Sequence, residues 1–184
     1  MIGVFRQDVA AIVRAVELLV LSTRRSNTAP APPAEAATKI WESEMAYGYN
    51  PPGIWGPNGR AFSQGVIAGE GVTLYITGQV AWDAESKVVG PGDCAAQMHK
   101  AIENTQVILE AAGGTLDDIV SMTIYFLARD DLPAIQEVRG QYFKTPTAPA
   151  SILIQVPGLV IPELLVEIVP IALIPHKRFK RPKT

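Results

Sequence analysis

Residues 93–127 read DCAAQMHKAIENTQVILEAAGGTLDDIVSMTIYFL, and they decide the fold because they predict a helix followed by a strand. Asp93 is a typical helix N-cap residue, and a pair of glycines after residue 112 ends the helix. Between these signals one stripe of side chains recurs at helical spacing: Cys94, Met98, Ala101, Ile102, Thr105, Leu109 and Ala112. From Ile119 to Leu127 the side chains alternate between two faces, with Ile124 and Phe126 on the same face, as in a strand.

The flanking sequence completes an α+β layer fold. A second helix is expected to start around Asp131 and Pro133, with its own apolar stripe at Leu132, Ile135, Val138 and Tyr142. The other expected strands are short and rich in β-branched residues: 72–77, 80–82, 87–89, 151–156 and 164–173. The prediction is a mixed six-stranded sheet with two helices packed on one face.

The composition is that of one folded domain with additional segments at its ends. The chain has 184 residues, of which 48% are hydrophobic and 18% are charged, and this balance excludes a disordered chain. A domain of roughly 150 residues buries about two-thirds of its extended-chain surface, so one core is sufficient. Cys94 is the one cysteine and cannot form a disulfide within the chain. Nothing therefore points to an oxidising compartment, and we expect a cytoplasmic protein.

Residues 1–44 form an N-terminal extension that we separate from the domain at 45–175. Residues 2–21 have apolar side chains at the spacing of an amphipathic helix, but four charged residues interrupt them. We therefore expect neither a membrane span nor a secretory signal. A Pro- and Ala-rich linker follows at 22–38. We expect the biological start at or near Met45, and a targeting peptide is the alternative for the preceding segment.

Charge is unevenly distributed between the domain and the C-terminal end. Residues 45–175 carry six basic and thirteen acidic groups, whereas the basic tail at 176–184 carries five basic groups and no acid. An acidic body repels phosphate backbones, and a short basic end is usually solvated. We therefore expect no nucleic-acid partner.

Short motifs follow one another from about Asn50 to Ile174: Phe62-Ser-Gln-Gly65, Tyr75-Ile-Thr-Gly-Gln79, Ala95-Ala-Gln97 with Glu103-Asn104, Leu109-Glu-Ala-Ala-Gly113, Pro149-Ala-Ser151 and Leu165-Val-Glu-Ile168. In their order and approximate spacing these motifs resemble the RidA (YjgF) family of reactive-intermediate deaminases. No single tetrapeptide is specific, but the ordered series is.

The resemblance implies a chorismate-mutase-like fold and a homotrimer whose sheets form a central barrel. It also implies three ligand clefts at the subunit interfaces. Active members of the family hydrolyse enamines and imines, such as 2-aminoacrylate, to a keto acid and ammonia without a metal or organic cofactor. We therefore expect no cofactor, a small-molecule substrate, further copies of this chain as partners, and no membrane association.

The resemblance also implies a set of substrate-contacting positions, and several of them differ in this chain. The family grips the substrate carboxylate with an Arg that follows the Pro-Ala of a Pro-Ala-Arg-Ser stretch, and here that Arg is missing. The positions carried over as substrate-binding are Phe62, Ser63, Gln79, Gln136, Ala150, Ser151 and Ile152. Gln79 has an alternative role, which is to satisfy backbone groups.

Glu167 is the candidate catalytic residue, because it matches the family's water-positioning Glu. A carboxylate within so apolar a strand is costly unless it is paired or its pKa rises. The functional interpretation is a general base or water anchor in the cleft. The alternative is an outward-facing carboxylate on an exposed strand face, since neighbouring strand residues point to opposite sides.

Other candidates have a functional and a structural interpretation. Arg60 is either a replacement cation for the missing Arg or a solvated loop residue. Cys94 is either a thiolate stabilised at a helix N-terminus or a buried structural cysteine. Trp55 and Trp82 either line the cleft or pack. The two histidines provide no metal-ligand spacing, so we expect no metal site.

Three functions follow from these residues. The first is hydrolytic deamination of a small imine or enamine that differs from 2-aminoacrylate. The alternative is a homotrimer that binds a small metabolite without catalysis. RNA cleavage, which older names in the family suggest, is disfavoured by the acidic body and by the lack of a paired acid/base His.

Overall fold

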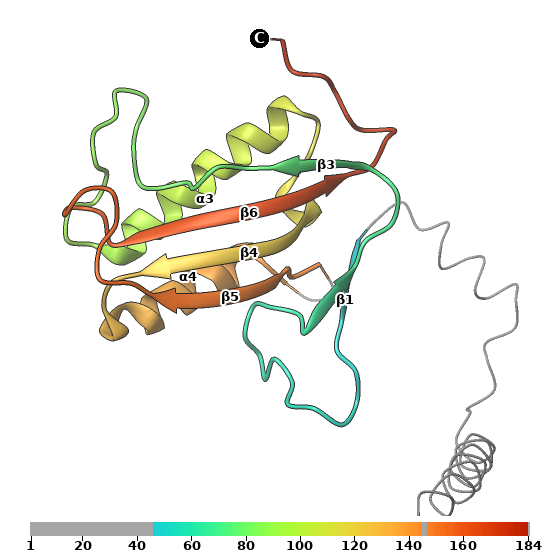
Figure 1. Ribbon diagram of the computed structural model, residues 1–184, viewed down its shortest axis with the longest axis horizontal. Helices are drawn as coiled ribbons and strands as arrows, with labels where there is room; N and C mark the ends of the chain where they lie inside the picture. The colour runs from blue at the N-terminus through green and yellow to red at the C-terminus, as the bar shows by residue number, and fades with distance from the viewer. Residues whose placement is uncertain (1–45, 145–146, 184) are drawn as a thin grey trace, which may run out of the picture. The chain divides into compact units, whose positions relative to one another are not determined.

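The computed structural model describes residues 46–144 and 147–183, and its centre is a four-stranded sheet with the strand order β3-β6-β4-β5 (Figure 1). The strands are β3 (Val72–Tyr75), β4 (Ile119–Phe126), β5 (Ala150–Gln155) and β6 (Val166–Ile174). β6 is antiparallel to β3 and β4, whereas β4 and β5 are parallel, so the sheet is mixed. The extension and linker expected at 1–44 lie outside the described residues.

Two helices cover one face of this sheet, α3 (Cys94–Ala111) and α4 (Leu132–Tyr142), and both lie behind it in Figure 1. Asp93 caps α3 by accepting a hydrogen bond from the Ala96 N–H at 3.0 Å, as its residue type predicts. The helix ends before Gly113, whose φ of +80° favours glycine. A short 3₁₀ turn precedes each of the next elements, Leu116–Asp118 before β4 and Arg129–Asp131 before α4.

The core lies between the helices and the sheet. Along β6, residues from Val166 to Ile174 alternate between fully buried and half-buried, so one face of the strand packs on the helices and the other is open. The expected stripes on both helices supply the other half of the core, including Met98, Ile102 and Ile135. The predicted α+β class with two helices on one face is confirmed. No helix in the two described ranges has both the length and the hydrophobicity to cross a bilayer.

The strands do not form the single six-stranded sheet that we expected. β1 (Tyr47–Tyr49) and β2 (Gly65–Ile67) make a separate antiparallel pair. The expected hairpin at 80–89 is reduced to one bridge between Trp82 and Val88. The Asp83 carboxylate accepts hydrogen bonds from the Glu85 and Lys87 backbone N–H groups. Two backbone hydrogen bonds also cross the turn, from the Asp83 N–H to the Lys87 carbonyl and from the Val89 N–H to the Ala81 carbonyl.

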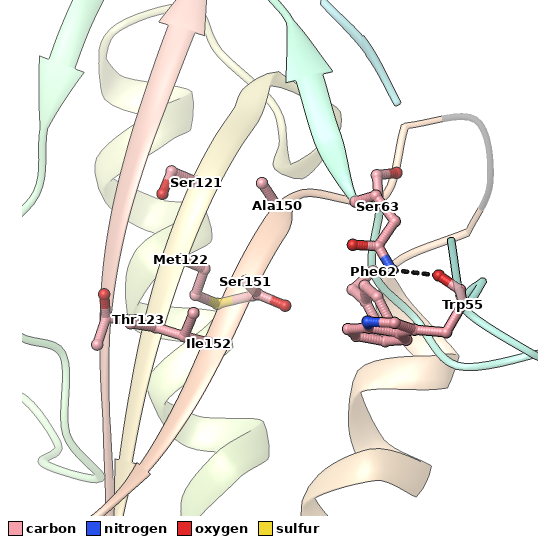
Figure 2. A pocket seen from close by; sticks show the side chains of 10 residues that line it. Trp55, Phe62, Ser63, Ser121, Met122, Thr123, Ala150, Ser151 and Ile152 are labelled. Atoms are coloured by element: carbon pink, nitrogen blue, oxygen red, sulfur yellow. Dashed lines mark hydrogen bonds between the residues drawn. The ribbon is translucent and has the colours of Figure 1, made fainter. Parts of the chain in front are cut away.

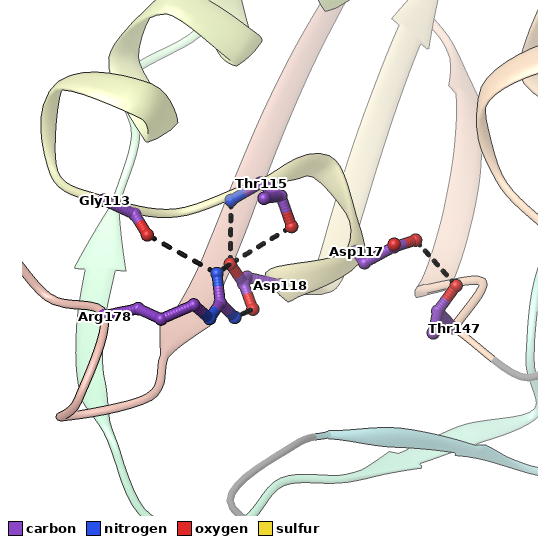
Figure 3. A network of polar contacts seen from close by, with 6 residues as sticks. All are labelled: Gly113, Thr115, Asp117, Asp118, Thr147 and Arg178. Atoms are coloured by element: carbon purple, nitrogen blue, oxygen red, sulfur yellow. Dashed lines mark hydrogen bonds and ion pairs between the residues drawn. The ribbon is translucent and has the colours of Figure 1, made fainter.

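The basic tail is not a fully solvated end, because Arg178 folds back onto the turn after α3 (Figure 3). Its guanidinium forms a two-pronged ion pair with Asp118, which is buried, and also reaches the Gly113 carbonyl at 3.4 Å. The same carboxylate accepts a hydrogen bond from the Thr115 backbone N–H at 2.7 Å. One charged pair therefore holds the tail against the loop that leads into β4.

Candidate functional site

A cavity of about 350 Å³ opens at the start of β5, where this edge strand faces the loop before β2 (Figure 2). Five of the residues predicted to bind substrate line it: Phe62, Ser63, Ala150, Ser151 and Ile152. The remaining lining residues come from the same loop and from β4: Trp55, Gln64, Ser121, Met122 and Thr123. The structure therefore brings together side chains that are about 90 residues apart in sequence.

The loop that forms one wall is held in place by its own hydrogen bonds. The Ser63 N–H donates to the Pro149 carbonyl at 3.1 Å, which continues the sheet by one bridge beyond β5. The Gln64 side chain donates to the Trp55 carbonyl, and the two aromatic rings of Trp55 and Phe62 lie 5.7 Å apart. Trp55 is 64% exposed, so it forms the outer rim of the cavity rather than part of a core.

Arg139 on α4 is the residue of this site that the sequence analysis missed. It is fully buried and donates hydrogen bonds to the Ala61 carbonyl at 2.8 Å, to Gln136 Oε1 at 3.2 Å and to the Ser151 hydroxyl. It forms no ion pair with any described residue, and its Nε–H has no hydrogen-bond partner there. Burial lowers the pKa of Arg139 to about 10, which leaves the guanidinium charged at neutral pH.

A positional signal for Arg139 was present in the sequence. Arg139 follows Ile135 by four residues and Leu132 by seven, so helical spacing places it on the same side as the apolar stripe. Gln136, one of the predicted substrate-binding residues, is not in the cavity wall but is connected to it through Arg139 and Ser151.

Arg60 lies elsewhere. Its side chain is exposed, donates to the Pro57 carbonyl at 3.0 Å and stacks outside the cavity wall, 5.8 Å from the Trp55 ring centre and 5.4 Å from that of Phe62. It lines a separate hollow of about 420 Å³ together with Gly140 and Lys144. The cation closest to the missing Arg position is therefore Arg139, through Ser151, and not Arg60.

Glu167 and Gln79 also lie apart from the cavity. Glu167 is half-buried on the open face of β6, opposite Tyr125, and its carboxylate occupies the space that a Cβ at Gly78 would fill. Gln79 pairs with Ile168 through its backbone, and its side chain donates to the Thr77 carbonyl at 3.1 Å. Gly78 and Gln79 line another hollow, of about 540 Å³, beside Trp82 and Asn104.

The pairing of β4 with β5 and β6 shows how far Glu167 lies from the cavity. Glu167 lies across β4 from β5 and two residues further along than Ile152. Strand spacing and rise per residue give about 12 Å between the two backbone positions. Ser151 points to the opposite face of the sheet, because its β4 partner is the buried Met122. One copy of the chain therefore does not place the Glu167 carboxylate beside Ser151.

Cys94 and His99, one of the two histidines in the sequence, both have surroundings that indicate a structural role. Cys94 is 5% exposed, and burial, together with Asp131 and Asp93, raises the pKa of its thiol to about 12. This favours the buried structural cysteine over a thiolate. His99 Nδ1 is hydrogen-bonded to the Tyr142 hydroxyl at 2.9 Å. In the described part of the chain, no group of three or more His, Cys, Asp or Glu side chains is arranged to hold a metal ion.

Comparison with known proteins is consistent with this geometry. Residues 57–174 match the family model described as endoribonuclease L-PSP. A RutC family protein from Pyrococcus horikoshii is 33% identical over 129 residues, which cover 70% of this chain and 96% of that protein.

Solved structures are similar to this chain in both sequence and fold. A protein of unknown function of the conserved Rid protein family from Yersinia pestis is 33% identical, with a TM-score of 0.66 over 70% of this chain and 98% of its own. RidA from an Antarctic Psychrobacter species is 31% identical, with a TM-score of 0.52 over 68% of this chain and 94% of its own. The family match, the relative at 33% identity and the shared fold show that this chain belongs to the RidA/YjgF family.

Proposed function

We propose that this protein hydrolyses a small imine or enamine to a carbonyl compound and ammonia, in a cleft between the subunits of a homotrimer. The observation that carries the proposal is the cavity at β5, since five of the seven predicted substrate-binding residues line it. Its volume of about 350 Å³ suits a small metabolite. The proposed substrate differs from 2-aminoacrylate, because the family's Arg is absent from its strand position.

The chemistry requires a positioned water and a group that carries its proton. An enamine first becomes its imine by gaining a proton at carbon and losing one from nitrogen. Water then adds to the C=N carbon, giving a carbinolamine, and its proton passes through Glu167 to the nitrogen. Collapse of this intermediate forms the C=O bond and releases ammonia, so one water is consumed for each imine. Glu167 is the proposed carrier because it is the carboxylate on the open face of β6 and has no ion pair among the described residues.

The open face of the sheet is the proposed subunit interface. It presents exposed apolar side chains on the same face as Glu167, including Tyr75 at 77% and Ile152 at 57% exposure. Such a surface is unusual for a free sheet face and favours contact with further copies of the chain. Contact of this face with the β5 edge of another copy would also bring a Glu167 carboxylate to a cavity from which it is separated within one subunit.

The second candidate function is metabolite binding without catalysis. The separation of Glu167 from the cavity within one copy is the observation that favours it, since binding at Ser151 does not need that carboxylate. The two functions share the cavity and the subunit interface, and they differ in the role of Glu167.

An imine hydrolysis assay tests the proposal. Imino acids generated by an amino-acid oxidase are trapped with semicarbazide, and a non-acidic imine is assayed in parallel. We expect acceleration of at least one substrate by the wild type and its loss in Glu167→Gln. Glu70→Gln is the control, because that carboxylate is exposed in the loop before β3. Absence of acceleration on every substrate, with saturable ligand binding retained, would replace the hydrolase with the binding protein.

A further inference from the structure

We propose that Arg139 and Ser151 form a binding site for the carboxylate group of a small ligand in the cavity at β5. This inference rests on the proposed function in one respect only: the proposed function makes the bound molecule a substrate or a product. The site itself is assigned from the surroundings of the two side chains.

The first step is the charge of Arg139. Its guanidinium is fully buried, and none of the described Asp or Glu residues forms an ion pair with it. Of its five N–H groups, three have acceptors, and all three acceptors are neutral: Ala61, Gln136 and Ser151. Buried cations in folded proteins are normally paired with an anion, and none of the residues in the described ranges supplies one to Arg139.

The second step is the direction of the Ser151 hydroxyl. Ser151 Oγ accepts a hydrogen bond from Arg139 Nη2, so its own O–H is free to donate elsewhere. Figure 2 shows this hydroxyl directed into the gap between β5 and the rings of Phe62 and Trp55, and Ser151 is part of the cavity wall. A guanidinium that donates to a hydroxyl makes that hydroxyl a stronger donor. The cavity is thus provided with a polarised donor that has a positive charge directly behind it.

The third step is the size and charge of the ligand. One buried positive charge is balanced by one negative charge, and a carboxylate carries one at neutral pH. The other cavity walls are mostly apolar or neutral, with Phe62, Met122 and Ile152 among them. A phosphate ester carries close to two negative charges, more than the single positive charge of Arg139 balances. A small monocarboxylate with an apolar remainder is therefore the ligand that fits.

The inference also accounts for the absence of an Arg on β5. The cation reaches the same strand from α4, and Ser151 presents its charge to the cavity. A substrate with a carboxylate would then be held one hydrogen bond further from the guanidinium than in a direct two-pronged contact. We expect weaker binding than a direct Arg contact gives, and tolerance of carboxylates of different shape.

Ligand-observed NMR with pyruvate as the probe tests the site on the full chain. We expect saturable binding to the wild type, at least tenfold weaker binding to Arg139→Met, and a smaller but measurable weakening in Ser151→Ala. Pyruvamide, which is neutral and of the same shape, should bind at least tenfold more weakly than pyruvate. Arg129→Met is the control, because that arginine is exposed before α4 and outside the cavity, and it should bind like the wild type.

The outcomes separate this inference from the proposed function. Equal pyruvate binding by the wild type, Arg139→Met and Ser151→Ala would overturn it, as would loss of binding in Arg60→Met alone. Inorganic phosphate competing more strongly than pyruvate would overturn the assignment to a carboxylate. Arg139-dependent pyruvate binding without imine hydrolysis would support the site and refute the hydrolase. Hydrolysis at the wild-type rate by Arg139→Met and Ser151→Ala would support the hydrolase and refute the site. If Arg139→Met does not fold, pyruvate binding by Ser151→Ala and by Arg139→Lys, each compared with the wild type, still tests the site.

Discussion

Replacing Arg139 with Met should leave the free energy of unfolding unchanged or raise it by up to about 2 kcal/mol. Burial lowers the pKa of the guanidinium to about 10, and the corresponding cost of keeping the charge in the core is about 3 kcal/mol. Met has a similar reach and no charge, so that cost disappears. Against this, the buried Ala61 carbonyl loses its donor, which costs about 1–3 kcal/mol.

The matched variant is Arg139→Ala, which removes the same charge but also leaves a cavity. A large-to-small change in a core costs about 2–5 kcal/mol, so we expect the Ala variant to be clearly less stable than the Met variant. Urea unfolding followed by circular dichroism measures both, at one fixed protomer concentration because assembly would add a concentration-dependent contribution.

A loss of more than about 2 kcal/mol in Arg139→Met would refute the reasoning, because it would mean that the buried charge is already compensated within the protein. Added pyruvate provides a second comparison. At a hundred times its dissociation constant it should stabilise the wild type by about 2.7 kcal/mol and the Met variant far less. A substitution that stabilises the free protein but weakens its ligand binding is the signature of a residue retained for function.

Three further predictions concern other parts of the molecule. Asp118→Asn should lower the free energy of unfolding by about 2–3 kcal/mol, because it breaks a buried charge-assisted contact with Arg178. A change below about 0.5 kcal/mol in urea unfolding would mean that the contact between the tail and Asp118 does not stabilise the fold. Gly78→Ala should displace the flexible end of the Glu167 side chain and abolish Glu167-dependent imine hydrolysis. The free energy of unfolding should change by less than about 1 kcal/mol. Hydrolysis at the wild-type rate would show that the position of the Glu167 carboxylate is unimportant. The Cys94 thiol, whose pKa burial raises to about 12, should resist iodoacetamide at pH 8. Since the unfolded thiol ionises near pH 9, stability should fall by up to about 1.4 kcal/mol per pH unit between pH 9 and 12, and less steeply in Cys94→Ala.

The elements that the sequence predicted correctly are those with a local signal. The Asp93 cap, the stripe of α3 and the alternation of β4 are each written within about 20 consecutive residues, and all three are present. The helix start near Pro133 is likewise found, with α4 beginning at Leu132. Patterns of this kind determine which face of an element is buried, and that was enough to give the α+β class.

The errors arise where a side chain takes over a role that the pattern assigns to the backbone or to solvent. Asp83 accepts two hydrogen bonds from the backbone of its own turn, and the expected hairpin there forms one bridge, between Trp82 and Val88. Arg178 finds Asp118 across 60 residues of sequence, and no local pattern could have removed it from the solvated tail. Arg139 was overlooked because an arginine is read as a surface residue, although its helical position is core-facing.

For the site, the sequence predicted the wall of the cavity better than its chemistry. Ser63 and Ser151 lie in one cavity as the motifs indicate, although they are 88 residues apart in the sequence. The replacement cation was expected at Arg60, close in sequence to Phe62, whereas the cation that contacts Ser151 is Arg139 on α4. A contact between a helix and the edge of a sheet depends on packing and leaves no trace in residue spacing.

The separation of charge in this fold bears on how a catalyst could be assembled from it. The buried cation acts on the helix-facing side of the edge strand through Ser151, and the candidate base, Glu167, stands on the open face two strands away. Had the two been adjacent within one subunit, they would have formed an ion pair, and the carboxylate would have been neutralised as a base. Keeping them on opposite faces leaves the guanidinium available for an anionic ligand and the carboxylate available for water. Both can then act on one molecule only where an edge strand meets the open face of another copy, so in this protein assembly and catalysis would be inseparable.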